Sequence, residues 1–371
     1  MSYETDITDI LKTNSDLRKL NSFRMDGGAF LHDLDKENDQ LHKMINLSSN
    51  DYLGITAKTK LQLEFFTSLP YEQFLLSSPS SRLMCGNNQH YDQLEKYIAN
   101  LYNSTAALVL GNGYILNSSL PRAITDKNSV ILADKLIHSS LVDGLKLAPC
   151  KWERFNHNDL THLEKLLQKH TDKRTVVIIE SLYSMDGDLA DAKGITYLKN
   201  KYNFELVVDE AHAFGVFGEQ GKGLFDDSTP DYRIVTLGKA AASYGAFVVC
   251  NDERKQLLVN KMKALIYSTA LPPIQIMWSR FIIEKITAMD SERTHLHQLI
   301  QSLGGTSQII PVMAGSNEKA LALQAQLKAE GFYTTAVRYP TVAKGTERLR
   351  ISLTAAHTTN QIEKLCKLLG L

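Results

Sequence analysis

The stretch "VVDEAHAFGVFGEQGKG", residues 207–223, places Asp209, Glu210 and His212 directly after a short apolar run. In a parallel sheet, ligands bind beyond the carboxyl ends of the strands, so charged side chains at such an end are candidates for a binding site. A purely structural explanation also exists, because Asp209 and Glu210 could cap a helix and His212 could be an ordinary loop histidine. Other parts of the chain have to decide between the two.

The composition predicts a globular protein without affinity for polyanions. The chain has 371 residues, of which 43% are hydrophobic, and it is long enough for two domains. Lys+Arg and Asp+Glu are equal at 41, so no net charge attracts nucleic acid or anionic lipid. The four cysteines form no CxxC motif, so we expect no zinc site, no disulfide framework and a reducing cytoplasmic location. No signal core or membrane span is expected either.

Short β-branched runs alternate with helical patterns from about Ala106 onward. The runs are "AALVL", "SVILA", "TVVIIE", "ELVVD", "IVTL" and "AFVVC". Between them lie helical patterns such as "DLTHLEKLLQKH", with Asp159 as a possible cap. This alternation predicts an α/β fold with a mostly parallel central sheet that is covered on both faces.

The pattern changes after about Tyr267. One long helical segment, "PPIQIMWSRFIIEKITAM", precedes the strand candidates "QIIPVM" and "RLRISL", which are separated by the helix candidate "NEKALALQAQLKAEG". We therefore expect a smaller C-terminal α+β domain at residues 267–371, a large domain at residues 46–266, and a helical N-terminal arm at residues 1–45.

Lys239 follows the run "IVTL" and is surrounded by small residues in "TLGKAAASYGAFVV". A desolvated lysine becomes a usable nucleophile, although most lysines with small neighbours are simply solvated. Pyridoxal phosphate (PLP) held on a lysine needs a carboxylate against its ring nitrogen, which Asp209 could supply. His212 could then reach the phenolic oxygen of the ring, which explains its spacing from Asp209. Together these residues favour a cofactor site over a helix cap.

Two further segments are compatible with such a site. "LVLGNGYILNSSL" runs from a strand through Gly111 and Gly113 into a helix, whose first N–H groups could bind a phosphate, although a turn without a ligand explains it equally well. His138 begins another helix in "DKLIHSSLVDG" and could stack on a ring, but a lone histidine is more often structural. The nucleotide motifs GxGxxG and GxxxxGK are absent. His157 and His162 have no third ligand nearby, and we expect no metal.

Seven segments occur in the order and approximate spacing typical of the α-oxoamine synthases: "LSSNDYLG", "DKLIHSSL", "ESLYSMDGD", "VVDEAHAFGVFGEQGKG", "TLGKAAASYGAF", "IYSTALPP" and "GTERLRISLTAAH". These are PLP enzymes of the aspartate aminotransferase fold, also called fold type I. The resemblance runs from about Asn46 to the C-terminus. It implies a PLP-dependent acyltransferase that acts as a homodimer with its active sites at the interface.

The resemblance also implies a role for individual residues. Lys239 is similar to the lysine that binds PLP covalently and transfers protons, Asp209 to the partner of the ring nitrogen, and His212 to the donor at the phenolic oxygen. His138 is similar to the residue stacked on the ring. Arg350 is similar to the arginine that binds the carboxylate of the amino acid, since a planar guanidinium can form two parallel hydrogen bonds to a carboxylate. The remaining matches are the phosphate ligands Gly113, Tyr114 and Thr236, the pocket residues Glu180 and Ser184, Thr269 from the neighbouring subunit, and the substrate-side residues Asn50 and Arg338.

Within the family, "VRYPTVAKGTERLRISLTAAH" is most similar to the biotin-pathway member, which condenses L-alanine with a pimeloyl thioester. Relatives use glycine or serine with other acyl thioesters, and this alternative stays open. The chain departs from the family at Ser77 to Arg82, "SSPSSR", where a glycine-rich loop is usual, and at Ala240, Ala241 and Ala242, where glycines are common. Outside the family, the alternatives are a catalytically silent binding protein and a nucleotide-binding oxidoreductase.

Overall fold

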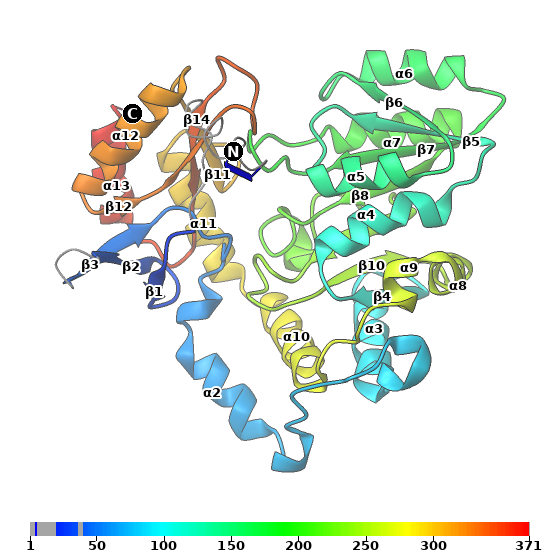
Figure 1. Cartoon of the computed structure of the whole chain (residues 1–371), viewed down its shortest axis with the longest axis horizontal. Helices are drawn as coiled ribbons and strands as arrows, with labels where there is room; N and C mark the ends of the chain where they lie inside the picture. The colour runs from blue at the N-terminus through cyan, green and yellow to red at the C-terminus, as the bar shows by residue number, and fades with distance from the viewer. Residues whose placement is uncertain (1–3, 6–19, 36–39, 371) are drawn as a thin grey trace. The chain divides into compact units, whose positions relative to one another are not determined.

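The computed structural model describes residues 4–5, 20–35 and 40–370 (Figure 1). The chain divides into two compact units. The large unit comprises Thr59–Ser184 and Asp188–Thr294, and the small unit comprises Met1–Lys58, Met185–Gly187 and His295–Leu371.

A seven-stranded sheet forms the centre of the large unit, in the order β4-β10-β9-β8-β7-β5-β6. Its strands are β4 (Ala106–Leu110), β5 (Ser129–Asp134), β6 (Lys151–Phe155), β7 (Arg174–Glu180), β8 (Glu205–Asp209), β9 (Tyr232–Thr236) and β10 (Ala246–Cys250). Strand β10 is antiparallel to both neighbours, and the other pairs are parallel. The predicted mostly parallel sheet is therefore confirmed. The edge strand β6 was not predicted, because four of its five residues are exposed or only partly buried and it therefore contains no apolar run.

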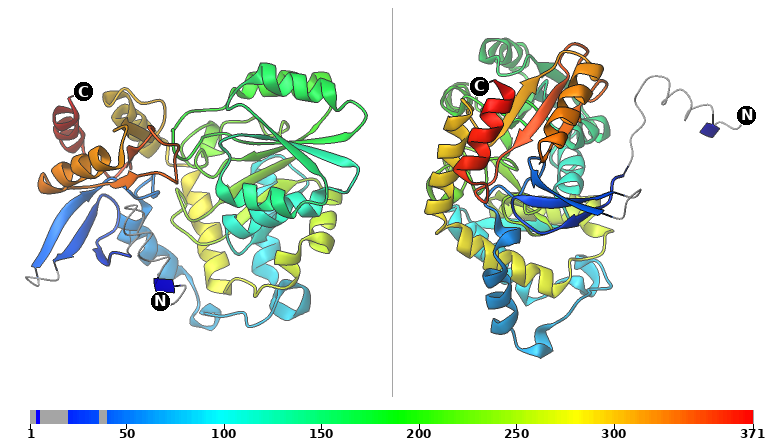
Figure 2. Two further views of the ribbon diagram at one scale, coloured as in Figure 1. Left: turned by 45° about the horizontal axis from the view of Figure 1, so that its top comes forward. Right: turned by 90° about the vertical axis from the view of Figure 1, so that its left-hand side faces the viewer.

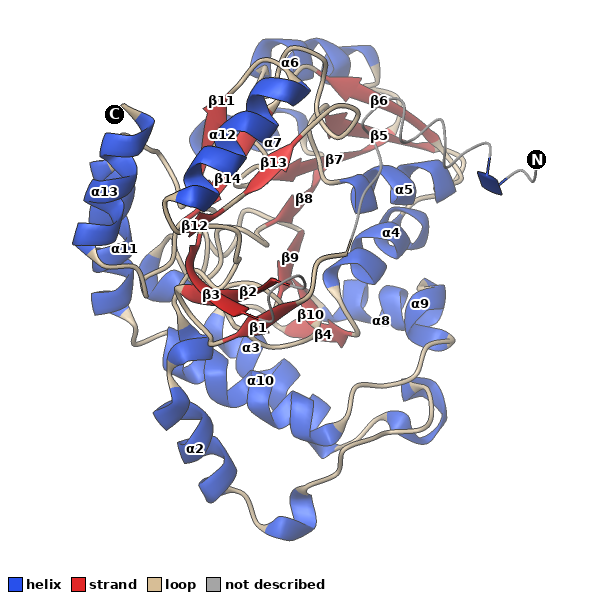
Figure 3. Ribbon diagram, turned by 60° about the vertical axis from the view of Figure 1, so that its left-hand side comes forward, coloured by secondary structure: helices blue, strands red, loops and turns tan. Residues whose placement is uncertain are grey.

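Helices cover both faces of this sheet, as predicted (Figure 3). Residues Ile131 and Ala133 of β5 pack in one apolar cluster with α4, α5 and α8, whereas Val130 and Leu132 pack in another with α6 and α7. The helices of the large unit are α2 (Thr59–Ser68), α3 (Gln89–Leu101), α4 (Gly113–Ile124), α5 (Ser139–Leu147), α6 (Leu160–Lys169), α7 (Ala192–Tyr202), α8 (Asp252–Lys261), α9 (Lys263–Ile266) and α10 (Pro273–Ile286). Asp159 caps α6, as its sequence indicated, by accepting a hydrogen bond from the His162 backbone.

The small unit contains two sheets and is built from both ends of the chain. Its strands are β1 (Phe23–Met25), β2 (Phe30–Asp35), β3 (Gln40–Asn46), β11 (Ile309–Met313), β12 (Phe332–Tyr333), β13 (Thr335–Val337) and β14 (Arg348–Ser352), and its helices are α12 (Asn317–Ala329) and α13 (Thr359–Leu369). The sheet orders are β1-β2-β3-β12 and β11-β14-β13. Helix α11 (Asp290–Ser302) contains the boundary between the units, and short helical turns lie at η1 (Ile55–Ala57), η2 (Tyr71–Gln73), η3 (Arg82–Gly86) and η4 (Glu219–Gly221).

The expected helical character of the N-terminal arm is wrong for residues 23–25, 30–35 and 40–46, which form an antiparallel meander (Figure 2). Much of the rest of the arm lies outside the described residues. Buried Leu31 and Met44 are cross-strand partners, and β3 pairs with β12 from the far end of the chain. Polar segments such as "HDLD" and "QLHK" carry little intrinsic strand signal, so pairing with other strands decides their conformation.

The compact units do not coincide with the ranges expected from sequence, 1–45, 46–266 and 267–371. Residues 23–46 belong to the small unit because β3 pairs with β12. Helix α10 belongs to the large unit, where its Trp278 and Phe281 pack against Phe65 of α2. Both assignments depend on long-range packing that local patterns do not reveal.

Across the described residues, we find no helix with both the length and the apolar character that crossing a bilayer requires.

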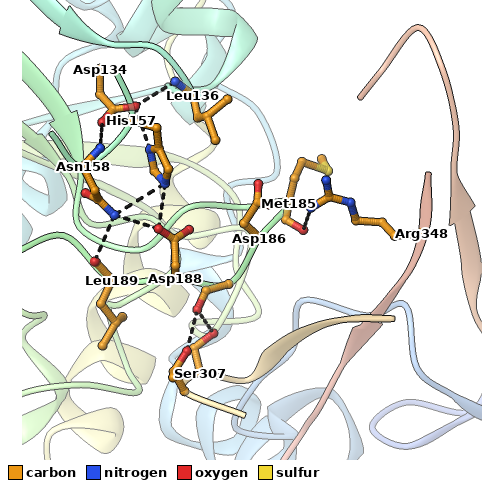
Figure 4. A network of polar contacts seen from close by, with 12 residues as sticks. Asp134, Leu136, His157, Asn158, Met185, Asp186, Asp188, Leu189, Ser307 and Arg348 are labelled. Carbon is orange, nitrogen blue, oxygen red and sulfur yellow. Dashed lines mark hydrogen bonds and ion pairs between the residues drawn. The ribbon is translucent and has the colours of Figure 1, made fainter. Parts of the chain in front are cut away.

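A histidine with carboxylates on both sides joins three strand ends of the large unit (Figure 4). Nδ1 of His157 lies 2.9 Å from Oδ1 of Asp134, the last residue of β5, and Nε2 lies 2.7 Å from Oδ2 of Asp188, which follows β7. Partial burial alone would lower the pKa of His157, but the hydrogen bonds and charges of the two carboxylates outweigh it and raise the pKa to about 10. His157 is therefore a structural cation at neutral pH.

Figure 4 also draws polar contacts within the small unit. Arg348 of β14 forms an ion pair with Asp186, and the Ser307 hydroxyl donates a hydrogen bond to the backbone carbonyl of Gly187 at 2.6 Å. These contacts explain why residues 185–187 belong to the small unit.

We predict that His157→Gln lowers the free energy of unfolding by about 2 kcal/mol at pH 7, the usual contribution of hydrogen bonds to a charged group. Because the folded pKa of about 10 lies above the ordinary value near 6.5, the stabilisation is complete below pH ~6.5 and is lost as the pH rises toward 10. Chemical unfolding of both proteins between pH 6 and 10 should show the difference shrinking. His162→Gln serves as the control. Nδ1 of His162 accepts a hydrogen bond from the backbone of Asn156, whereas His157 contacts two carboxylates. A difference for His157→Gln that stays constant across this range would contradict the assignment.

Candidate active site

The two adjacent acids of the opening segment have different roles. Glu210 is fully buried and accepts hydrogen bonds from Arg233 at 2.8 Å and from the backbones of Leu224 and Phe225 at 3.0 Å. Arg233 is itself 1% exposed, so this is a buried, fully hydrogen-bonded ion pair that belongs to the core. The residues that follow β8 form turns, so Asp209 and Glu210 cap no helix there.

Asp209 is the last residue of β8 and is 4% exposed. Its Oδ1 accepts a hydrogen bond from the Ala211 backbone at 2.9 Å, and its Oδ2 accepts one from Nδ2 of Asn117 at 2.8 Å. Two donors from different elements thus hold the carboxylate in one orientation. Such a buried, oriented acid is what the nitrogen of a bound pyridinium ring requires.

Lys239 and His212 meet at the same end of the sheet. Nζ of Lys239 lies 2.6 Å from Nε2 of His212, which is 5% exposed. Lys239 follows β9 and His212 follows β8, and these two strands are parallel neighbours. The amine of Lys239 and the imidazole of His212 are therefore in hydrogen-bond contact, and an amine of this kind can act as a nucleophile. His212 lies three residues after the buried carboxylate of Asp209 in the sequence.

His138 and Glu180 form the next part of the site. His138 is the N-cap residue of α5, and its backbone N–H donates a hydrogen bond to the carboxylate of Glu180, the last residue of β7. Burial lowers the pKa of His138, and the charge of Lys239 lowers it further against the opposing effect of Asp209. Burial and then the charge of Asp209, its register partner, raise the pKa of Glu180 well above its usual range. Burial therefore favours the uncharged form of both side chains.

The N-terminus of α4 forms a cradle for an anion. Asn112 caps this helix by accepting a hydrogen bond from the Ile115 backbone at 2.9 Å. A Cβ atom at Gly113 would lie 3.2 Å from Cβ and 3.3 Å from Oγ1 of Thr236. Any larger residue at position 113 would therefore require the Thr236 side chain to shift slightly. The free N–H groups of Gly113 and Tyr114 and the Thr236 hydroxyl can bind phosphate oxygens. The side chain of Tyr114 is half-exposed and donates a hydrogen bond to Asp143.

The substrate-side residues lie in the small unit. Nη2 of Arg350 in β14 donates to Oδ1 of Asn50 at 3.3 Å, and Nη1 donates to the Ser352 hydroxyl at 2.6 Å. The structure therefore brings Asn50 and Arg350 together, as part of a group with buried Tyr52, whose hydroxyl donates to the same Oδ1 at 3.0 Å. Arg338 follows β13, and its backbone carbonyl accepts hydrogen bonds from Thr341 and Val342.

Ser184 and Thr269 belong to the large unit. Ser184 is partly buried in the loop after β7. Thr269 is exposed and forms a β-bridge with Ser81, in the loop that departs from the family pattern. Arg82 anchors that loop to the large unit through hydrogen bonds to Glu95 at 2.6 Å and to the Val109 carbonyl at 2.9 Å.

Two buried polar residues of the site were missed in the sequence. Asn117 lies within α4 and Ser140 within α5, both among apolar residues of amphipathic helices. The only sequence signal was a polar residue at a position that helical periodicity assigns to the core. Asn117 contacts Asp209, and Ser140 contacts His138.

The described side chains fit PLP. The large unit holds a lysine amine, an oriented carboxylate, an imidazole beside the lysine, and a helix N-terminus for a phosphate, all at the carboxyl edge of parallel strands or in the turns that follow. These four groups have the chemistry to meet, respectively, the aldehyde carbon, the ring nitrogen, the phenolic oxygen and the phosphate of the cofactor.

Comparison with known proteins assigns the chain to a family. The family described as "Aminotransferase class I and II" matches residues 42–369. The chain is 41% identical over 340 residues to "Putative 8-amino-7-oxononanoate synthase" of Haemophilus influenzae, covering 87% of this chain and 90% of the relative. It is 42% identical over 351 residues to "8-amino-7-oxononanoate synthase" of Haemophilus ducreyi, covering 88% and 91%.

The fold also matches solved structures. A structure of SPT with PLP superimposes with a TM-score of 0.89 at 23% identity, covering 100% of this chain and 98% of that one, which confirms the expected fold type I architecture. The chain therefore belongs to the aminotransferase class I and II family, and within it to the PLP-dependent acyltransferases known as α-oxoamine synthases.

Proposed function

We propose that the protein condenses L-alanine with a pimeloyl thioester, releasing carbon dioxide and the free thiol and forming 8-amino-7-oxononanoate for biotin biosynthesis. The observation that carries the proposal is the contact between Lys239 and His212 next to the oriented carboxylate of Asp209. The names of relatives that are 41% to 42% identical over most of their length support this choice of substrates.

In this proposal Lys239 holds PLP covalently, Asp209 pairs with the ring nitrogen, and His212 contacts the phenolic oxygen. The phosphate is bound by Gly113, Tyr114 and Thr236, and the ring is covered by His138. When bound, the cofactor withdraws electrons from the α-carbon of the amino acid. The chain's own residues supply the binding and the proton movements.

Lys239 is the base that takes the α-proton. Its amine shares a hydrogen bond of 2.6 Å with Nε2 of His212, so the imidazole can hold or return a proton at that atom. Arg350 supplies the positive charge that pairs with the substrate carboxylate. Its guanidinium is held by hydrogen bonds to Asn50 and Ser352. Ser184 and Glu180 contribute to the pocket wall, and Arg338 to the acyl-substrate side.

The enzyme is further proposed to act in the cytoplasm as a homodimer, in which Thr269 of one subunit completes the phosphate site of the other. Its exposed side chain is compatible with this role. The carrier of the acyl chain is either coenzyme A or an acyl carrier protein. A second candidate is an α-oxoamine synthase that uses glycine or serine with a different acyl-CoA. The loop from Ser77 to Arg82 supports keeping this candidate, because its departure from the family pattern bears on the choice of acyl substrate.

Assays of substrate pairs test the proposal. Purified, PLP-loaded protein should release free thiol and form 8-amino-7-oxononanoate from L-alanine and pimeloyl-CoA, or from the corresponding acyl carrier protein thioester. The value of kcat/KM should exceed that for glycine by about tenfold or more, which is the usual effect of one missing methyl group in a fitted pocket. Faster turnover of a glycine or serine pair would support the second candidate instead, and absence of turnover with every thioester would exclude both.

We predict that Arg350→Ala raises the KM for alanine by about 10- to 100-fold, because it removes a charged hydrogen-bonding partner worth roughly 1.5–3 kcal/mol. PLP content should be unchanged, because Arg350 is assigned to substrate and not to cofactor. Arg350→Lys should give an intermediate KM, since lysine keeps the positive charge but cannot form the two parallel hydrogen bonds of a guanidinium. Arg280→Ala removes a partly exposed arginine paired with Glu284 and is the matched control. An alanine KM within twofold of the wild type for Arg350→Ala would refute the role.

A further inference from the structure

A continuous chain of buried side chains connects Asp209 with His138. Nδ2 of Asn117 donates to Oδ2 of Asp209 at 2.8 Å and to Oγ of Ser140 at 3.1 Å, and the same Oγ lies 2.7 Å from Nδ1 of His138. Asn117 is 4% exposed and Ser140 is fully buried. Neither residue corresponds to a part of the cofactor, so their contacts act on the two residues that do.

The direction of each hydrogen bond follows from the carboxylate at one end. If the Asn117 amide were flipped, its oxygen would face Oδ2 of Asp209, and two acceptors would be in contact. The nitrogen therefore faces Asp209, and the two amide protons go to Asp209 and to the Ser140 hydroxyl. Having accepted one proton, the Ser140 hydroxyl has its own proton to donate, and Nδ1 of His138 is the acceptor in contact with it.

A second donor points to the same ring nitrogen. The backbone N–H of Ser140 lies 3.3 Å from Nδ1 of His138, as expected for the N-cap residue of α5. Nδ1 is thus an acceptor for two donors and carries no proton itself. A neutral imidazole of this kind has its single proton on Nε2.

We propose that Asn117 and Ser140 are positioning residues that fix His138 as the Nε2–H tautomer, so that its ring offers a hydrogen-bond donor to an anionic or carbonyl oxygen of the substrate. This inference rests on the proposed function, in which His138 covers the cofactor and contacts the substrate. In the opposite tautomer Nε2 would be an acceptor and would repel a carboxylate or thioester oxygen. The uncharged state of the ring agrees with this role, because burial and the charge of Lys239 lower the pKa of His138.

The two positioning residues differ in what their loss should change. Asn117 holds both Asp209 and Ser140, so substituting it alters the ring-nitrogen partner together with the tautomer. Ser140 contacts His138 and Asn117 and makes no contact with Asp209 among the hydrogen bonds of the described residues. Ser140→Ala is therefore the selective test, and Ser139→Ala, at an exposed position on the same turn of α5, is its control.

The experiment uses PLP-loaded full-length protein. Nitrogen-15 NMR of histidine-labelled protein, with His138 assigned by its loss in His138→Gln, should show an unprotonated Nδ1 and a protonated Nε2 in the wild type. Ser140→Ala should retain the yellow cofactor absorption, show a mixture of tautomers, and lose about tenfold in kcat/KM, the usual value of one lost hydrogen bond at a charged or reacting group. Ser140→Thr keeps the hydroxyl and should restore both readouts, and Ser139→Ala should match the wild type.

A protonated Nδ1 in the wild type would overturn the proposal. So would a Ser140→Ala protein with lower thermal stability but an unchanged tautomer and unchanged kcat/KM, because Ser140 would then serve only the helix start. The tautomer measurement needs no turnover. If the wild type bound PLP but made no product from alanine and a pimeloyl thioester, the proposed function would fail while the tautomer result still decided this inference.

Discussion

The buried carboxylate of Asp209 is the constraint on which the site depends. A charge at the end of a parallel strand, with only 4% of the residue exposed, has to be met by donors, and the fold supplies them from Asn117 and from the backbone of Ala211. The same charge acts on its neighbours, since it adds to burial in raising the pKa of Glu180. Asp209 is therefore oriented for a cationic ring, whereas burial beside it favours the uncharged form of Glu180.

The charges of the large unit fall into two groups with separate roles. The ion pair of Glu210 and Arg233 and the contacts of His157 with Asp134 and Asp188 are satisfied within the protein, so they hold strands and loops in place. We propose that Asp209, Lys239 and His212 instead serve a ligand. Adjacent residues such as Asp209 and Glu210 can belong to different groups because successive side chains at a strand end point in opposite directions.

Much of the large unit could be predicted from sequence because its signals are local. Apolar runs predicted the five inner strands and the edge strand β4, and Asp159 marked the start of α6. Where local signals were weak, prediction failed: β6 exposes most of its residues, and the N-terminal strands depend on pairing with β12. The site shows the same division. Lys239, Asp209 and His212 were predicted because they follow or end apolar runs, and the structure places Nζ of Lys239 in contact with Nε2 of His212. Asn117 and Ser140 were not found, since a polar residue inside an amphipathic helix acquires its role only when the helices are packed.

The central claim is that the amine of Lys239 forms a covalent bond with PLP. The most direct measurement is reduction of the PLP-loaded protein with borohydride, which makes that bond permanent, followed by digestion and mass spectrometry. We predict one phosphopyridoxyl group per chain, on Lys239 and on no other lysine. Labelling of a different lysine, or a protein that binds no PLP, would contradict it.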